Sequence, residues 1–358
     1  MKAQNLAKEK MMIRNLLLSL LAVLAVTACQ GNSADTDKSV KTTPVTDENY
    51  SLAETDGIIE GYVKKIAAAT NTNGVGVLMH YREGADPKDR TIMRINFDTI
   101  YSWAIVDLTE PATLTMPETN GRYQSAWIVS EDGYYPGAFT TPGEHKITRE
   151  WIGGARYAVI VMRTQVNTKD PADLAKAHAL QDKLKLTQKD RGSWAPANQW
   201  DQQEVAAMRV KYQKIGDGMD TAKMFGKKGE ISLRNRNAGN AFGWGGLTPD
   251  QAVYPQYFPE STEHQTLTLK DVPVKAFWSI TVYDKEGFPQ TDTYNINSAF
   301  AVADADGSVT IDFGGDKNAK NYMETFDGWN FTLRMYEPTK AYFDGTWKKP
   351  ELKLVKSK

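Results

Sequence analysis

The alternating stretch Val272–Asp284 constrains the fold of this chain more than any other feature. Its apolar residues recur at every second position, which is typical of a β-strand with one buried face. Val309–Phe313 and Trp329–Met335 carry the same pattern. We therefore predict that these three strands form one antiparallel sheet, packed against a second layer.

The rest of the chain predicts a mainly β protein with a helical connector. Short apolar runs separated by proline and glycine fill residues 75–161, as in β-rich domains. The 358 residues suffice for two domains, each with its own core. We expect a lipoprotein signal peptide at residues 1–28 and a flexible tether at 29–49. An N-terminal β domain with a leading helix is expected at 50–170, a connector of helices and loops at 171–246, and a C-terminal antiparallel β domain at 247–358.

Three helices are predicted outside the strands. Apolar residues from Ile58 to Ile66 fall at helical spacing, with Asp56 placed to cap that helix. Two further helices are expected at about 171–186 and 202–215. Residues 219–246 are rich in glycine and asparagine, and within this stretch Phe242–Gly246 is predicted to be a loop.

The N-terminus is typical of an exported protein. Four basic residues precede an apolar run, Leu16–Val26, which is too short to span the ~30 Å hydrocarbon layer of a membrane. Together with Val26-Thr-Ala-Cys29, this pattern resembles a bacterial lipoprotein signal. The resemblance implies cleavage before Cys29, acylation of Cys29 by chains such as palmitate, and, because Gln30 follows, the periplasmic side of the outer membrane. The alternative is an ordinary secretory signal.

Cysteine and charge usage exclude several classes of protein. Cys29 is the only cysteine, so an internal disulfide is impossible and a thiol nucleophile is not expected. The 43 basic and 44 acidic side chains nearly cancel, giving a formal net charge of -1, and no basic stripe is present. We therefore expect no nucleic-acid partner, while the oligomeric state stays open.

Motifs in both halves of the chain resemble a paired bacterial family. In the N-terminal half these motifs are Arg94–Ser102, Gly121–Tyr123, Arg163–Thr164 and Ala179–Asp182, and they resemble domain of unknown function 1254. The C-terminal half resembles domain of unknown function 1214. Its motifs are Ala252–Pro255, Phe277–Asp284, Leu333–Tyr336 and Asp344–Trp347.

What this resemblance implies is mainly architectural. It implies an immunoglobulin-like β-sandwich domain followed by a jelly-roll-like antiparallel domain, with helices between them. This chain departs from the family in its short connector and in Ile95, which stands where a proline is usual. The family names carry no activity.

The segment Asn96–Tyr101 is the best candidate site in the sequence. Asn96, Asp98 and Tyr101 could converge on a polar ligand, or Asp98 could act as a base. The alternative is structural, with Asn96 and Asp98 closing a turn through the backbone and Tyr101 bonding across the sheet. Arg122 could pair with Asp98 or receive an anionic ligand, and Tyr123 adjoins it.

Other chemistry has weaker support. His80 is the histidine nearest this segment and a candidate acid–base partner, but the four histidines show no zinc-binding spacing. The aspartate-rich stretch 304–315 departs from a calcium loop at two positions. We predict neither a metal nor a cofactor. The aromatic loops Tyr134–Gly137 and Phe242–Gly246 could bind sugars or lipids, although core packing is favoured.

These features lead to two functional hypotheses. The first is an envelope-accessory protein that binds a small molecule or glycan segment in an aromatic cleft near Asn96–Tyr101, with Arg122 and Tyr123 contributing. The second is a hydrolase in which Asp98 and His80 exchange protons with the substrate. A mechanical or assembly role would be favoured by a broad exposed apolar patch instead.

Overall fold

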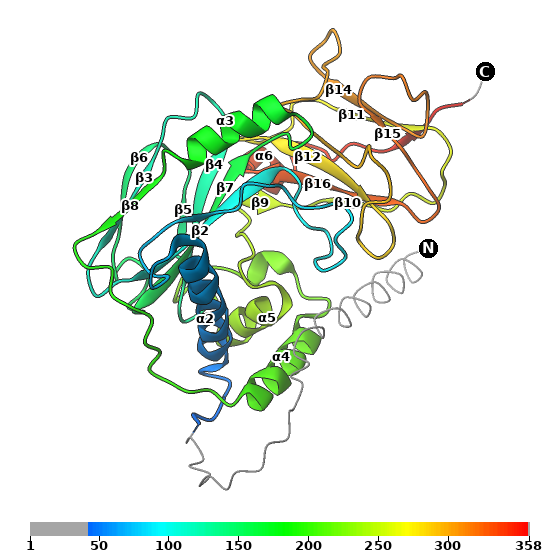
Figure 1. Cartoon of the computed structure of the whole chain (residues 1–358). Coiled ribbons are helices and arrows are strands. Elements are labelled where there is room, and N and C mark those ends of the chain that lie inside the picture. Colours follow the sequence, from blue (N-terminus) through cyan, green and yellow to red (C-terminus); the bar gives the residue numbers. More distant parts are fainter. Residues whose placement is uncertain (1–41, 357–358) are drawn as a thin grey trace, which may run out of the picture.

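The computed structural model describes residues 42–356 (Figure 1). Strands make up 26% and helices 21% of the described residues, so the prediction of a mainly β protein with helical segments is confirmed. The strands form several largely antiparallel sheets, and within the described residues none of these closes into a barrel. The immunoglobulin-like and jelly-roll-like assignments stay predictions. The signal segment and Cys29 lie outside the described residues.

Two antiparallel sheets build the N-terminal part. The five-stranded sheet has the order β1-β2-β7-β4-β5, with bounds Met79–His80, Thr99–Asp107, Tyr157–Gln165, Gln124–Ser130 and Gly137–Phe139. The three-stranded sheet has the order β6-β3-β8, with bounds Gly143–Ile147, Ala112–Met116 and Lys185–Gln188. β8 replaces the end of the helix predicted at 171–186, because that helix stops at Gln181 and the chain then pairs with β3.

Alternation along β7 explains how the larger sheet is buried on both faces. Ala158, Ile160 and Met162 point into a core shared with the three-stranded sheet. Tyr157, Val159 and Val161 point to the other face and pack in a second cluster with helix α2 (Tyr50–Thr70). This opposite orientation of successive side chains follows from the period of two in a strand.

Helices cover the second face of this sheet. Figure 1 shows α2 beside the sheet, with α4 (Gln202–Gly216) and α5 (Leu233–Gly243) gathered on the same side. α2 begins at Tyr50 and not at Asp56, which lies buried inside the helix, so the predicted cap was wrong. α3 (Pro171–Gln181) lies apart from these helices and packs near β7, with Asp170 capping its N-terminus.

Two segments differ from the prediction made for them. α5 was not predicted, and it ends at Gly243, so the loop predicted at Phe242–Gly246 begins only at Trp244. A short 3₁₀ helix, η1 (Thr221–Lys223), precedes α5. Residues 42–49, expected within the flexible tether, instead contact α4 and the chain before it. Thr43 forms a parallel β-bridge with Trp200, and the amide of Val45 donates a hydrogen bond to the Glu204 carboxylate at 2.7 Å.

The C-terminal part also contains two sheets around one core. The first has the order β10-β16-β12-β13, with β9 also pairing with β16, and the second has the order β15-β14-β11-β17. Bounds for the first are Gln256–Tyr257, Asn330–Tyr336, Trp278–Tyr283, Asn295–Asn297 and Ala252–Val253. Bounds for the second are Tyr322–Met323, Val309–Phe313, Gln265–Leu269 and Lys353–Leu354. A short helix, α6 (Lys340–Phe343), follows β16.

The predicted pairing of the three alternating strands is corrected in part. β12 and β16 are neighbours in one sheet, as predicted. β14 belongs to the facing sheet, where it pairs with β11 and, in parallel, with β15. The apolar side chains of all three strands still meet, because Ile280, Ile311 and Leu333 share one buried cluster.

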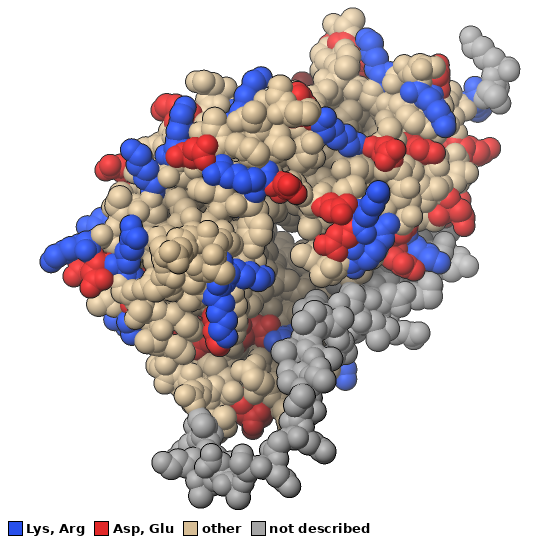
Figure 2. All heavy atoms as spheres, viewed as in Figure 1, with Lys and Arg blue, Asp and Glu red and all other residues tan. Residues whose placement is uncertain are grey.

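Surface charge is dispersed on the face drawn in Figure 2. On the face drawn in Figure 2, basic and acidic side chains are interspersed and neither sign gathers into a patch. Within residues 42–356, no helix has both the length and the apolar composition needed to cross a membrane.

Candidate functional site

A cavity of about 670 Å³ lies where the N-terminal sheet, the connector and the C-terminal sheet meet. Its size falls within the roughly 300–1,000 Å³ that is usual for small-molecule sites. The walls come from β2 and β7, from residues 94–96, from η1 and the chain after α5, and from β9, β16 and α6. In Figure 1, β9, β16 and α6 lie beside the N-terminal sheet, on the side that faces the cavity.

β16 contributes one wall through the alternation of its side chains. Phe331, Leu333 and Met335 are fully buried in the C-terminal core. Thr332, Arg334 and Tyr336 emerge on the opposite face and line the cavity. The alternation that buries one face of β16 in the C-terminal core therefore also turns the side chains of its other face toward the N-terminal sheet.

β2 and β7 contribute the facing wall. Tyr101 on β2 is opposite Arg163 on β7 in the register of the sheet, and both side chains line the cavity. The carbon of the Arg163 guanidinium lies 5.5 Å from the centre of the Tyr101 ring. Arg163 continues the row formed by Tyr157, Val159 and Val161, at the point where the helical cover gives way to the cavity.

Two more arginines line the cavity, and both are held by neutral acceptors. Arg94 donates from Nη2 to Oδ1 of Asn330 at 2.6 Å and from Nη1 to Oγ1 of Thr332 at 3.1 Å. Arg334 donates to Oγ1 of Thr281, to the hydroxyl of Tyr283 and to the carbonyl of Arg94. These bonds fix both guanidinium groups without neutralising them.

Aromatic rings form much of the remaining lining. Phe225 packs against Gly246, where an added Cβ would come within 2.4 Å of the ring, so this close approach requires glycine. Phe343 is 53% exposed beside the cavity. The other aromatic residues of the lining are spread along the chain and are Tyr101, Phe242, Tyr254, Tyr336 and Tyr342.

Asp98 lies beneath this cavity and is fully buried. Its carboxylate accepts hydrogen bonds from Ser279 Oγ at 2.5 Å, Asn295 Nδ2 at 3.1 Å and the Tyr336 hydroxyl at 3.3 Å. Burial, together with the negative charge of Asp98, raises the pKa of Tyr336 well above its usual value, so the phenol stays a donor. Asp98 does not line the cavity, and these contacts give it a role in joining the two halves of the chain.

Asn96 lines the cavity while also closing a turn. Its Oδ1 accepts from the amide of Asp98 at 2.7 Å, and its Nδ2 donates to Oγ1 of Thr99 at 3.2 Å. This is the backbone contact expected of the structural alternative. Asn96 therefore shapes the cavity edge through a local turn.

Arg122 and Tyr123 lie away from the cavity. Arg122 pairs with Asp173, at the start of α3, and not with Asp98; Nη1 donates to Oδ2 at 3.0 Å. Tyr123 is buried, donates to Oγ of Ser125 at 2.9 Å, and has its pKa raised by burial to about 12. Both residues support the end of the N-terminal sheet, and neither lines the cavity.

His80 is engaged with a neighbouring strand. Its Nδ1 lies 2.7 Å from Oγ of Ser102, which also accepts from Nε2 of Gln181 at 3.2 Å. Burial lowers the pKa of His80, so the ring is neutral at pH 7. Ser102 is only 1% exposed and neither residue lines the cavity, so this pair has no access to a substrate there.

The aromatic loops are mostly structural. The buried hydroxyl of Tyr135 donates to Oδ1 of Asn240 at 2.9 Å, and the indole of Trp244 donates to Oγ1 of Thr55 at 3.1 Å. Phe242 is the aromatic residue of these loops that lines the cavity. The favoured core role therefore describes Tyr135 and Trp244 but not Phe242.

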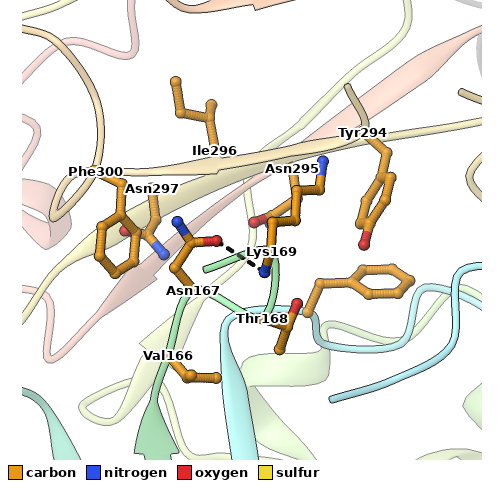
Figure 3. A pocket seen from close by; sticks show the side chains of 10 residues that line it. Val166, Asn167, Thr168, Lys169, Tyr294, Asn295, Ile296, Asn297 and Phe300 are labelled. Carbon is orange, nitrogen blue, oxygen red and sulfur yellow. Dashed lines mark hydrogen bonds between the residues drawn. The ribbon is translucent and has the colours of Figure 1, made fainter. Parts of the chain in front are cut away.

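A second, smaller pocket of about 130 Å³ lies between residues 166–169 and 294–300 (Figure 3). Asn295, which donates to Asp98, lines it together with Asn167 and Lys169. Burial lowers the pKa of Lys169, and its ammonium lies 4.3 Å from the centre of the Tyr294 ring while also donating to the Asp292 carbonyl. These contacts leave little reactive capacity in this pocket.

The cavity chemistry fits binding better than proton transfer. Of the residues predicted for the site, Asn96 and Tyr101 line the cavity, whereas Asp98, His80, Arg122 and Tyr123 do not. Arg163 was not predicted as a site residue, although it belongs to the motif Arg163–Thr164. A charged residue at the end of an otherwise apolar alternating row could have indicated it. Within residues 42–356, no group of three or more metal-ligating side chains gathers.

Comparison with known families and structures bears on the fold alone. The model of the family described as protein of unknown function (DUF1254) matches residues 75–133, and that of DUF1214 matches residues 258–340. The resemblance predicted for the two halves is thus confirmed. The matched segments supply facing parts of the cavity, with Tyr101 in the first and Tyr336 in the second. No curated protein matches the sequence.

Two solved structures are similar to this chain to different degrees. The VPA0106 protein from Vibrio parahaemolyticus is 16% identical, with a TM-score of 0.60, and the match covers 87% of this chain and 98% of that one. This likeness shows a common fold. An uncharacterised protein from Burkholderia cenocepacia is 13% identical, with a TM-score of 0.46, and the match covers 98% of this chain and 94% of that one.

Proposed function

We propose that this protein binds a small organic molecule in the 670 Å³ cavity between β2, β7 and β16. The single observation that carries the proposal is the composition of the lining. Aromatic rings provide apolar contact area, and arginine side chains held by hydrogen bonds provide orientation. A cavity of this size with few, fixed polar groups is the usual form of a small-molecule site.

The N-terminal motif supports a proposal for where binding occurs. The lipoprotein-like signal favours a protein anchored through acylated Cys29 at the periplasmic face of the outer membrane. Two or more acyl chains hold a protein firmly at a membrane, whereas one chain gives marginal binding. We therefore propose an envelope-accessory role, in which a small molecule or glycan segment is bound near the membrane. Incorporation of labelled palmitate, lost in Cys29→Ser, tests the anchor.

The binding proposal is tested by filling the cavity without disturbing a core. Ala222 and Lys223 are exposed neighbours on η1, and only Ala222 lines the cavity. Ala222→Trp should place an indole in the cavity, while Lys223→Trp should leave it open. The full chain would be placed in lipid nanodiscs and screened against small metabolites and cell-wall fragments by thermal shift, with empty nanodiscs as the blank.

The expected result is a set of compounds that raise Tm for the wild-type protein and for Lys223→Trp, but not for Ala222→Trp. A library with no stabilising compound would contradict the proposal. So would stabilisation of the same size in Ala222→Trp, because the bound compound would then lie outside this cavity.

A further inference from the structure

Arg163 has a feature that the other cavity arginines lack. Its Nη1 atom is buried, and no described residue accepts a hydrogen bond from it. A buried donor on a charged group is normally paired, because taking such a group out of water without a partner is costly. Stacking on Tyr101 covers one face of the guanidinium, but the N–H donors lie in its plane and are not satisfied by a ring.

The environment of Arg163 explains why the chain itself does not supply a partner. Its cross-strand neighbours in the sheet are Tyr101 and Ser125, and neither carries a charge to neutralise it. Tyr336 and Tyr123 lie close enough to interact with the charge electrostatically, but both are held as neutral phenols by burial. The counter-ion therefore has to come from the cavity side.

Most of the other charged side chains of the lining have the same sign. Arg94 and Arg334 also line the cavity, and among the described residues neither forms a salt bridge. Asp220 is the acidic residue of the lining, and it is exposed and caps η1 through a bond to the Ala222 amide. The lining thus has an excess of positive charge. A cleft with low-dielectric walls focuses the electric field of such charges and attracts anions.

We propose that the cavity selects organic carboxylates with an apolar or planar body, and that Arg163 is the residue that receives the carboxylate. The inference rests on the proposed binding function and names the class of ligand. A guanidinium presents parallel N–H donors that match the two oxygens of a carboxylate. The rings of Tyr101, Phe225 and Phe242 offer apolar contact for the remainder of the molecule.

The other two arginines of the lining differ from Arg163 in their hydrogen bonds. Hydrogen bonds to neutral acceptors hold Arg94 and Arg334 in place, so they attract an anion without being free to rotate toward it. Arg163 alone combines a place in the lining with a buried N–H group that lacks an acceptor among the described residues. The assignment of the carboxylate to Arg163 follows from this difference.

Matched acid and amide pairs test the inference directly. Binding of 1-naphthaleneacetate and 1-naphthaleneacetamide to the full chain in nanodiscs would be measured by titration calorimetry, with benzoate and benzamide as a second pair. The wild-type protein should bind the acid of at least one pair roughly tenfold more tightly than its neutral partner, since hydrogen bonds to charged groups are the stronger ones.

Variants at Arg163 separate charge from geometry. Arg163→Met keeps the length and removes the charge, so the preference for the acid should fall to about one; Arg163→Lys keeps the charge but loses the planar fork and should give an intermediate preference. Arg163→Met gives up no hydrogen bond to a described residue, so it should remain folded. The exposed Arg149, which bonds only the Gly154 carbonyl, provides the matched control Arg149→Met.

Each other outcome has a distinct meaning. Equal binding of acid and amide would overturn the inference and leave the cavity as a binding site. A preference that persists in Arg163→Met would overturn the assignment to Arg163. If no member of either pair binds, the result counts against the proposed function as well as against the inference.

Discussion

Ser279 donates a 2.5 Å hydrogen bond to the carboxylate of Asp98, which lies 181 residues earlier in the chain. This contact joins the N-terminal and C-terminal sheets. Asn295 and Tyr336 donate to the same carboxylate from β13 and β16. Asp98 itself begins the turn into β2, where its carbonyl accepts from the amide of Val166. One buried side chain thus holds the N-terminal sheet against the C-terminal sheet, next to the cavity.

Removing the Asp98 carboxylate should loosen this junction. Asp98→Ala leaves the buried hydroxyls of Ser279 and Tyr336 without this acceptor. Each such group costs about 1–3 kcal/mol, so we expect a loss of about 2 kcal/mol or more in the free energy of unfolding. Denaturant unfolding measures this change. Asp250→Ala, at an exposed position, is the control and should be nearly neutral.

A double-mutant cycle identifies the partner. If the bond to Ser279 matters, Asp98→Ala and Ser279→Ala should show a coupling free energy of about 1 kcal/mol or more, because the two side chains are in direct contact. Strictly additive losses would contradict a role for this contact in joining the sheets.

Arg122 and Asp173 should make the protein sensitive to acid. The hydrogen bonds from Arg122 hold the pKa of the Asp173 carboxyl below its usual value. A carboxyl whose pKa is lower in the folded state contributes stability above its unfolded value of about 3.9 and loses it as the pH falls through the folded value. Asp173→Asn should therefore lower stability by about 1–3 kcal/mol at pH 7 and flatten the loss below pH 4.

The Arg82–Asp182 pair gives the matched control. Both of its side chains are well exposed, at 39% and 61%, and exposed pairs contribute about 0–1 kcal/mol. Stability would be measured between pH 3 and pH 7 for Asp173→Asn and Asp182→Asn. Equal losses in the two variants would show that burial adds nothing to the Arg122–Asp173 pair.

Asp56 should have the opposite effect on pH dependence. It is buried in α2, accepts from the indole of Trp200 at 2.7 Å, and has its pKa raised by burial to about 7. A folded-state pKa above the unfolded value means that the folded protein holds the proton more tightly. The stability from this proton is present below about pH 4, declines as the pH rises to about 7, and is absent above it.

Replacing Asp56 by its neutral isostere tests this sign. Asp56→Asn keeps an oxygen for Trp200 but cannot ionise, so it should match the wild-type protein near pH 4 and exceed it by up to a few kcal/mol at pH 8. The exposed Asp217 provides the control, and Asp217→Asn should change stability equally at both pH values. An Asp56→Asn protein that is less stable than wild type at pH 8 would refute the raised pKa.

The sequence predicts faces of strands better than their partners. Alternation along β16 correctly places Phe331 and Leu333 in the core, because the period of two is a local property of the backbone. The same alternation in β14 did not reveal that this strand lies in the facing sheet, since both sheets offer an apolar face. Arg122 likewise pairs with Asp173, 51 residues away, and no local pattern encodes such a contact.

α5 is a helix that the glycine- and asparagine-rich composition did not predict. Asn237, Gly239 and Asn240 are buried in it, where they allow close packing against neighbouring segments. A Cβ on Gly239 would lie 2.6 Å from the Met224 carbonyl, and Asn240 donates both to the Gly133 carbonyl and to Oγ of Ser51. Ser232 caps the helix by accepting from the amide of Asn235, and this cap was the signal available in the sequence.

Close packing at Gly246 should control the shape of the cavity. A Cβ added there would come within 2.4 Å of the Phe225 ring, and the backbone at Gly246 is otherwise one that alanine can adopt. Gly246→Ala should therefore displace Phe225, which also makes an edge contact with Tyr135 at 5.2 Å between ring centres. Overpacking of this kind costs about 1–3 kcal/mol.

Gly243 provides the control for this change, because nothing lies within 4 Å of a Cβ added there and it also lines the cavity. Gly243→Ala, at the end of α5, should be neutral or slightly stabilising, since alanine favours the helix. Thermal unfolding and ligand titration of both variants are compared with the wild-type protein. Gly246→Ala should lower Tm and weaken binding in the cavity. If the two variants behave alike, Phe225 is free to move and does not form a fixed part of the wall.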